Sequence, residues 1–322
     1  MRADIIILIL LSVFFLKSCK PRDEKQKVMY INSYHSSFPP SQQITEGVFE
    51  SLSPDSFEIT VHFMDTKRNS SEAFIKKRVS ELLDSIHSER PDILILSDDN
   101  ALKYLLLPNI HTIEIPVVFC GINWTADQYK LPTQGVTGIL EVLPLEELVQ
   151  TLKPYYPEMK KLLVLNENTT TSRKTKPVLD TVLNDQGILV SQELVDDFES
   201  WKSVFVRANQ NYDIIYLQTR GAIKNWNHDE ALNIIKEYIK IPLVTCEEFM
   251  MPYAVLGLTQ ISKEQGFLAG EAAKRILRGT NPSDIPITKN QLSKIWINTD
   301  LAEKIGFTPD KELLKQAKIV SK

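Results

Sequence analysis

Polar and aromatic side chains follow three apolar runs in the first half of the chain, where predicted strands end. In an open α/β sheet, ligands bind at the carboxyl ends of strands, so these side chains are candidate ligand contacts. Two adjacent acids, Asp98 and Asp99, suit an ammonium group. Asn123 can hydrogen-bond a ligand, and Trp124 can stack on one. The candidate ligand-binding residues of this half are Tyr34, His35, Ser97, Asp98, Asn100, Asn123 and Trp124.

Most of these residue types also have a purely structural use, and the sequence leaves both uses open. Tyr34 and His35 can form a hydrogen-bonded pair within their loop. Asp98 or Asp99 can cap the helix that follows them. Trp124 can be an interface aromatic rather than a ligand contact.

The second half of the chain places anion-binding and acidic side chains at similar positions. A hydroxyl-rich turn containing Asn168 and Thr169 precedes a predicted helix, whose amino-terminal end attracts a carboxylate or another anion. Arg220 follows the predicted strand Ile214–Leu217 and can fork onto a carboxylate, whereas Glu247 follows another strand and can bind a cationic group. The alternatives are helix capping and, for Arg220, an ordinary surface arginine. The candidate ligand-binding residues of this half are Asn168, Thr169, Arg220 and Glu247.

The sequence lacks the patterns of common enzymes, since it contains no GxSxG, HExxH, GxxxxGK or GxGxxG. His35 with Asp98 or Asp99 is a combination that could act as an acid–base pair. Cys120 and Cys246 end apolar strands and are expected to be buried thiols, because a disulfide between the two halves would lock them together. The five histidines and three cysteines lack metal-ligand spacing. We therefore predict a binding protein rather than an enzyme, with no metal and no cofactor.

Chain length and net charge limit the number of domains and the kinds of partner that the protein can have. A chain of 322 residues, 43% hydrophobic and 24% charged, is long enough for two globular domains. A net charge of −4, a sequence pI of about 5.8 and the lack of a basic stripe argue against a nucleic-acid partner.

An internal repeat predicts the elements that position the candidate residues. Each half reads strand, helix, strand, helix, strand, which is typical of a doubly wound parallel sheet. The alternative is chance similarity between buried strands. The matched segments are Val28–Asn32 with Leu162–Asn166, Pro91–Asp98 with Tyr212–Thr219, and Ile115–Cys120 with Ile241–Cys246.

The amino-terminal residues resemble a bacterial lipoprotein signal. Arg2 precedes the apolar run Ile5–Leu16, which is too short to span a bilayer, and a small residue precedes Cys19. In such signals the cysteine is lipidated and becomes the new amino terminus; Lys17 is atypical there. We predict a signal peptide over residues 1–19 and a polar tether over 20–27, the alternatives being an ordinary signal peptide or a short anchor.

The carboxyl-terminal part of the chain is expected to cross back between two completed lobes. We predict a first lobe of residues 28–138 plus about 258–284, and a second lobe of residues 139–257 plus about 285–322. The fold class is therefore α/β, with two doubly wound parallel-sheet lobes joined by a hinge of three crossings.

Five segments, in this order, carry a resemblance to a known family: IPVVFCGIN, GVTGILEVLP, KLLVLNENTTTSRKTKP, YDIIYLQTRGAI and EQGFLAGEAAKRILRG. Together they resemble the ABC-transporter substrate-binding protein family of the type I periplasmic-binding-protein fold, over residues 28–309. INSYHSSFPPSQQITEGV and LSDDNALKYL are similar to a subgroup of extracytoplasmic sensor modules fused to kinases.

The resemblance implies two lobes that close on a small ligand like a Venus flytrap. We expect an exported monomer, lipid-anchored to a bacterial membrane and facing the periplasm or cell exterior. Its ligand is expected to be amino-acid-like or another aromatic metabolite, nucleobase-like compounds included, which it delivers to an ABC permease. The alternative partner is a membrane sensor kinase, to which the protein would present its ligand.

Overall fold

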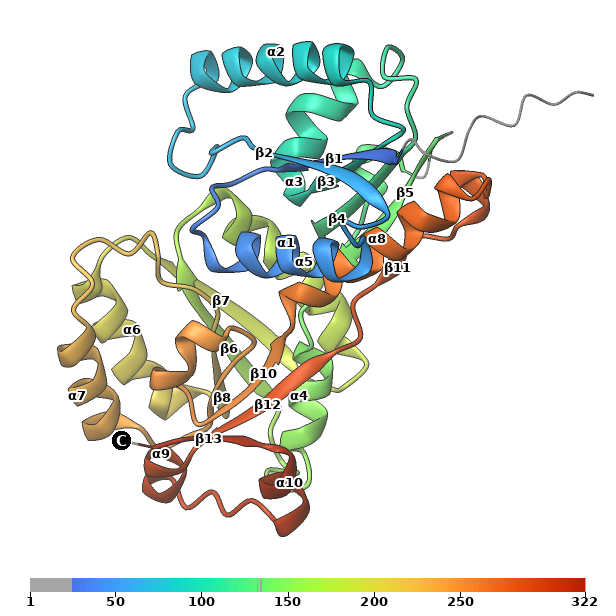
Figure 1. The fold of residues 1–322 in the computed structure, drawn as a ribbon. Helices are drawn as coiled ribbons and strands as arrows, with labels where there is room; N and C mark the ends of the chain where they lie inside the picture. The colour runs from blue at the N-terminus through green and yellow to red at the C-terminus, as the bar shows by residue number, and fades with distance from the viewer. Residues whose placement is uncertain (1–24, 132, 134, 322) are drawn as a thin grey trace, which may run out of the picture.

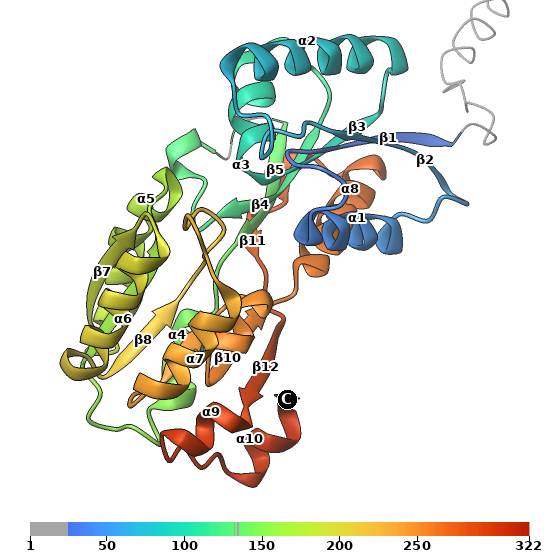
Figure 2. The ribbon, with the colours of Figure 1, turned by 90° about the vertical axis from the view of Figure 1, so that its left-hand side faces the viewer.

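The computed structural model describes residues 25–131, 133 and 135–321, which form two α/β lobes (Figures 1 and 2). Each lobe is built on one sheet. The first sheet has six strands in the order β11-β5-β4-β3-β1-β2, and the second has seven in the order β13-β12-β10-β9-β8-β6-β7. Neighbouring strands are parallel except for β10 and β12. The predicted fold class is confirmed.

Continuous apolar runs form the central strands of the first lobe, because helices cover both faces of its sheet there and bury their side chains. All five residues of Ile93–Ser97, for example, are buried. Its strands are β1 (Gln26–Asn32), β2 (Phe57–Phe63), β3 (Ile93–Ser97), β4 (Val117–Asn123), β5 (Val136–Glu141) and β11 (Thr288–Lys289). Its helices are α1 (Pro39–Ser51), α2 (Glu72–Glu89), α3 (Asp98–Asn100), η1 (Ala101–Leu106), η2 (Leu107–Asn109), η3 (Asp127–Tyr129), α8 (Ser262–Leu277) and η5 (Pro282–Asp284).

The second lobe repeats this plan around one large apolar core. Trp201 and Phe205 of α6 stack face to face within it. Its strands are β6 (Lys161–Glu167), β7 (Leu189–Val195), β8 (Ile214–Leu217), β9 (Leu243–Thr245), β10 (Leu256–Gln260), β12 (Ser293–Asn298) and β13 (Lys318–Val320). Its helices are α4 (Leu145–Leu152), α5 (Thr170–Asn184), α6 (Phe198–Asn211), α7 (His228–Tyr238), η4 (Glu248–Tyr253), α9 (Thr299–Lys304) and α10 (Lys311–Gln316).

Helix α8 comes late in the chain but packs on the first lobe, beside α1 (Figure 1). Ala269, Ala273 and Ile276 join the core on one face of the first sheet. A Cβ atom on Gly266 would lie 1.9 Å from the main-chain oxygen of Ile44 in α1. Glycine is therefore required for the close approach of the two helices.

The chain crosses between the lobes after β5, after β10 and after β11. Residues 139–141 end β5 and residues 288–289 form β11, so both belong to the first sheet. Residues 258–260 end β10, in the second sheet. The crossings thus lie a few residues later than the predicted boundaries, because strand pairing rather than composition determines where each strand ends.

The predicted signal peptide, Cys19 and residues 20–24 lie outside the described residues. Gln26 and Lys27, which the sequence assigned to the tether, instead begin β1 and pair with β2. Cys120 and Cys246 are free, buried thiols in different lobes. In the described parts of the chain, no helix is both long enough and apolar enough to span a bilayer.

Candidate functional site

Side chains from the carboxyl ends of strands in both lobes meet between the lobes. Glu141 ends β5 of the first sheet and accepts a hydrogen bond from Gln260, which ends β10 of the second. Trp124 follows β4 and packs against the apolar core of the second lobe. Because parallel sheets bind ligands at this edge, the region between these strand ends is the candidate ligand site.

Four carboxyl groups, which we call the acidic cluster, converge on this region: Asp98, Asp99, Glu141 and Glu247. Burial raises the pKa of Asp98 well above its usual range, and the charges of Glu141 and Asp99 add to this effect. Burial raises the pKa of Glu141 to about 7. Burial and then the charge of Glu141 raise the pKa of Glu247 to about 8. Since Glu247 lies in the second lobe, carboxyl groups of both lobes are near enough for their charges to interact.

Hydrogen bonds fix one member of the acidic cluster, Asp99. The Tyr129 hydroxyl donates to one carboxylate oxygen at 2.5 Å, and Asn123 Nδ2 donates to the other at 2.9 Å. Asn123 therefore positions an acid in the site. The capping alternative for Asp98 and Asp99 is wrong, because Ser97 occupies the N-cap position and α3 begins at Asp98. Asp98 instead adopts a positive φ of 68°.

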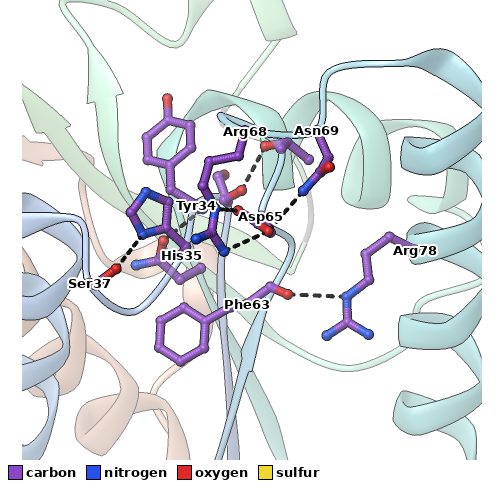
Figure 3. A network of polar contacts seen from close by, with 11 residues as sticks. Tyr34, His35, Ser37, Phe63, Asp65, Arg68, Asn69 and Arg78 are labelled. Carbon is purple, nitrogen blue, oxygen red and sulfur yellow. Dashed lines mark hydrogen bonds and ion pairs between the residues drawn. The ribbon is translucent and has the colours of Figure 1, made fainter.

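Tyr34 and His35 differ in their surroundings although they are adjacent. Burial raises the pKa of the Tyr34 hydroxyl, and the charges of Asp98 and Asp99 add to this, so its ring lies beside the acidic cluster. His35 Nδ1 lies 2.9 Å from the Ser37 hydroxyl, its hydrogen-bond partner within the same loop (Figure 3). His35 thus follows the structural alternative, and no acid–base pair with Asp98 or Asp99 is formed in the described structure.

Ser97 and Asn100 form hydrogen bonds that hold neighbouring strand ends together. The Ser97 and Tyr30 hydroxyls share a hydrogen bond of 3.0 Å in the interior. Asn100 Nδ2 donates to the Thr66 hydroxyl at 2.9 Å, and that hydroxyl donates to the main-chain oxygen of Ser33. These contacts join the ends of β1 and β3 to the loop after β2.

That loop contains Lys67, a cation that the sequence reasoning missed. Lys67 Nζ lies 3.9 Å from the centroid of the Phe38 ring and 5.2 Å from that of Tyr34. Its charge lowers the pKa of Asp98, Glu141 and Glu247, and the Asn100–Thr66 hydrogen bond holds its loop beside the helix that begins at Asp98.

Asn168 and Thr169 lie in the second lobe and have local partners. Thr169 is the N-cap of α5, where its hydroxyl accepts a hydrogen bond from the Ser172 amide. Asn168 Nδ2 donates to an Asp196 carboxylate oxygen at 2.9 Å. Thr169 thus follows the capping alternative, Asn168 has an acidic partner in its own lobe, and the described structure shows no contact of either with the acidic cluster.

Arg220 lies against aromatic rings of the second lobe. Its guanidinium carbon is 5.4 Å from the Trp226 ring centroid and 5.5 Å from that of Tyr253. The Tyr253 hydroxyl accepts a hydrogen bond from Trp226 Nε1 and shares another with His228 Nδ1. Arg220 Nε is buried and has no hydrogen-bond partner, and no carboxylate of the described residues forms an ion pair with this guanidinium. Arg220 is thus available for an anionic group.

Glu141, Gln260 and Lys67 lie at the candidate site but are absent from the sequence prediction. Glu141 ends the apolar run of β5, and Lys67 follows β2 after three residues. Both therefore fit the strand-end pattern that identified Asp98 and Glu247. Within the described residues, no group of three or more His, Cys, Asp and Glu side chains is arranged to hold a metal ion.

The raised pKa values predict that the ligand-free protein loses stability as pH rises from about 5 to about 8. The ordinary pKa of a glutamate carboxyl group is 4.5, so between pH 4.5 and the raised pKa values of Glu141 and Glu247 the folded state binds more protons than the unfolded state. Stability is therefore highest below this window and falls through it by several kcal/mol. Urea unfolding at pH 5.5, 7.0 and 8.5 measures the slope. A flat or rising profile would contradict it.

Known proteins resemble this chain in sequence. The family model described as ABC transporter substrate binding protein matches residues 36–321. A tyrosine-binding protein of Clostridioides difficile strain R20291 is 24% identical over 209 residues, which cover 61% of this chain. The chain spans 58% of the length of that relative.

Two solved structures share the fold. One is an ABC domain from Streptococcus pneumonia in complex with L-Trp, with a TM-score of 0.66, 18% identity, and coverage of 92% of this chain and all of the other. The second is a ligand-free, open substrate-binding protein with adhesive properties from Clostridium difficile, with a TM-score of 0.70, 16% identity, and coverage of 92% and 99%. With a family match over most of its length and this two-lobed fold, the chain belongs to the ABC transporter substrate-binding protein family.

Proposed function

We propose that this substrate-binding protein captures an amino-acid-like, aromatic ligand between its lobes and delivers it to an ABC permease. The observation that carries the proposal is the acidic cluster, whose carboxyl groups come from strand ends of both lobes. Burial with like charges is costly for carboxylates, and a ligand ammonium group would relieve that cost. The tyrosine-binding relative and the L-Trp complex of a structural neighbour support this ligand class.

The other chemical groups of an aromatic amino acid also have counterparts in the structure. Arg220, without an ion-pair partner in the described residues, suits a carboxylate. The partly exposed rings of Tyr34 and Phe38 in the first lobe, and of Trp226 in the second, supply apolar surface for an aromatic ring. A nucleobase-like compound is the second candidate ligand, because it would use the rings without the ammonium contact.

Binding is proposed to act through closure of the hinge. A ligand stabilises the closed form only to the extent that it binds that form more tightly. Contacts to acids of both lobes provide this difference in affinity, and the Glu141–Gln260 hydrogen bond links two of the strands from which the chain crosses. A membrane partner would then recognise the closed shape.

The proposed anchor is a lipid on Cys19, with residues 20–24 and Lys25 linking it to β1. Two or more acyl chains would hold the protein stably on a membrane surface. Retention of a Cys19→Ser variant in the membrane fraction would contradict this anchor.

A thermal-shift screen of the chain from Lys20, which contains all of the described residues, tests the ligand class. L-Tyrosine, L-tryptophan, their decarboxylated amines, their deaminated acids, nucleosides and sugars form the panel. A ligand at about 100 times its Kd should stabilise the protein by roughly 2.7 kcal/mol, or a few degrees. A shift confined to nucleosides or sugars would replace the proposed ligand class, and no shift with any compound would refute it.

A further inference from the structure

Lys67 is carried by a loop whose backbone is held firmly. Asp65 adopts a positive φ of 57°, and Arg68 forks onto its carboxylate with bonds of 2.7 and 2.8 Å (Figure 3). Asn69 Nδ2 donates to the same carboxylate at 2.9 Å (Figure 3). These bonds therefore fix the main chain of Lys67, which lies between Asp65 and Arg68, while the Lys67 side chain is exposed.

The ammonium group of Lys67 has the surroundings expected for a bound amine. It lies over the Phe38 ring and near that of Tyr34, a geometry that attracts cations. It forms no ion pair within the described parts of the chain. Yet its charge acts on three members of the acidic cluster, Asp98, Glu141 and Glu247, and among described lysines and arginines it alone acts on all three.

We propose that Lys67 is a built-in competitor, whose ammonium partly neutralises the carboxyl groups of both lobes in the empty protein and is displaced by the ammonium of the ligand. This inference rests on the proposed function, since it concerns the same cleft. Four rotatable bonds and an exposed position let the side chain swing outward, and a cation over an exposed ring is held weakly. The competing role for Lys67 is direct binding of a ligand carboxylate.

The Lys67→Met variant distinguishes the two roles by the sign of its effect. Methionine keeps apolar contact with the Phe38 ring but removes the charge. If Lys67 competes, Kd for tyramine, tryptamine and the parent amino acids should fall about 3- to 10-fold, because a like charge that interacts with the same carboxyl groups is removed. The gain should shrink at high salt. Weaker binding of the amino acids, or no change for any amine, would overturn the proposal.

Two further variants control for charge and for packing. Lys294 also stacks on a ring, with Nζ 4.5 Å from the Trp296 centroid in the second lobe, and it is not among the groups that shift the pKa of the acidic cluster. Lys294→Met makes the same change in net charge and should leave Kd unchanged. Lys67→Arg restores a cation and should lose most of the gain in affinity. A similar gain in Lys294→Met would attribute the effect to net charge and refute the competitor.

A second measurement does not need a ligand. Carboxyl-carbon NMR titration should show the pKa of Glu141 and of Glu247 rising in Lys67→Met, and hardly moving in Lys294→Met. If no compound binds the wild-type protein, the proposed ligand class fails while this titration still decides about Lys67. Unchanged carboxyl titrations in Lys67→Met would overturn the inference whatever the binding assays show.

Discussion

Replacing Glu247 with glutamine is expected to weaken binding of an amine-bearing ligand by about 30- to 1000-fold. Glu247 is the member of the acidic cluster from the second lobe, and no side-chain hydrogen bond within the described residues satisfies it. Its loss removes a charged contact worth about 2 to 4 kcal/mol and, with it, the acidic second-lobe contact that favours closure. Isothermal titration with L-tyrosine, L-tryptophan and their amines measures the effect.

The same substitution should have the opposite effect on stability. A carboxyl group whose pKa is raised to about 8 costs free energy when it ionises, so Glu247→Gln should raise the free energy of unfolding at pH 8. A variant that unfolds less readily but binds the ligand more weakly has lost a ligand contact, because misfolding would lower the free energy of unfolding as well. Glu248→Gln, at the exposed next position, should change neither quantity. Equal affinities for the wild-type protein and Glu247→Gln would show that Glu247 does not contribute to ligand binding.

Gly266→Ala is expected to destabilise the first lobe by about 3 to 5 kcal/mol. The new Cβ would lie 1.9 Å from the Ile44 main-chain oxygen and 2.9 Å from the Val48 amide nitrogen. Main-chain atoms of a packed helix cannot rotate away, so α1 and α8 must separate and open the core between them. This strain exceeds the roughly 1 kcal/mol that alanine contributes through helix propensity. Urea unfolding monitored by circular dichroism measures the change.

Gly270→Ala, one turn later on the same helix, is the matched control. There the nearest atoms are Oγ and Cβ of the Ser51 side chain, at 2.6 and 2.7 Å, followed by Leu52 Cγ at 3.3 Å. Ser51 Oγ can rotate away, and Ser51 Cβ at 2.7 Å requires a smaller displacement of the helices than the Ile44 main-chain oxygen at 1.9 Å, so the loss of stability should be smaller than for Gly266→Ala. Equal losses in the two variants would show that backbone contact between α1 and α8 is not the cause.

The strands could be predicted closely because each central strand is buried on both faces and reads as a continuous apolar run. Ile214–Leu217 was predicted with its observed bounds. Helix α7 was predicted only as a helix without bounds between the second and third strands of the repeat, and strand β13 was missed, since the partly buried α7 and the short, exposed Lys318–Val320 lack such a run. Gln26 and Lys27 look like a charged tether, but pairing with β2 extends the strand over them.

The candidate site was predictable only in part, because a residue at a strand end has two possible uses. Asp98 and Thr169 both follow a strand and precede a helix, yet Thr169 caps its helix whereas Asp98 joins the acidic cluster. The choice depends on backbone φ and on neighbouring strands, which the local sequence does not determine. Trp124 packs on the second lobe for a similar reason, since its surroundings come from residues distant in the chain.

The position of α8 has a consequence for the order in which the protein can fold. The hydrogen bond from Ser51 to Glu271 joins residues 220 positions apart, and α8 covers a core formed by the earliest strands. Until α8 is available, that face of the first sheet stays uncovered and the first lobe lacks part of its interior. Contacts of such long range form slowly, because closing a long loop precedes any stabilisation. The second lobe, whose strands β6 to β10 follow one another directly, therefore has the shorter route to its native state, although it begins later in the chain.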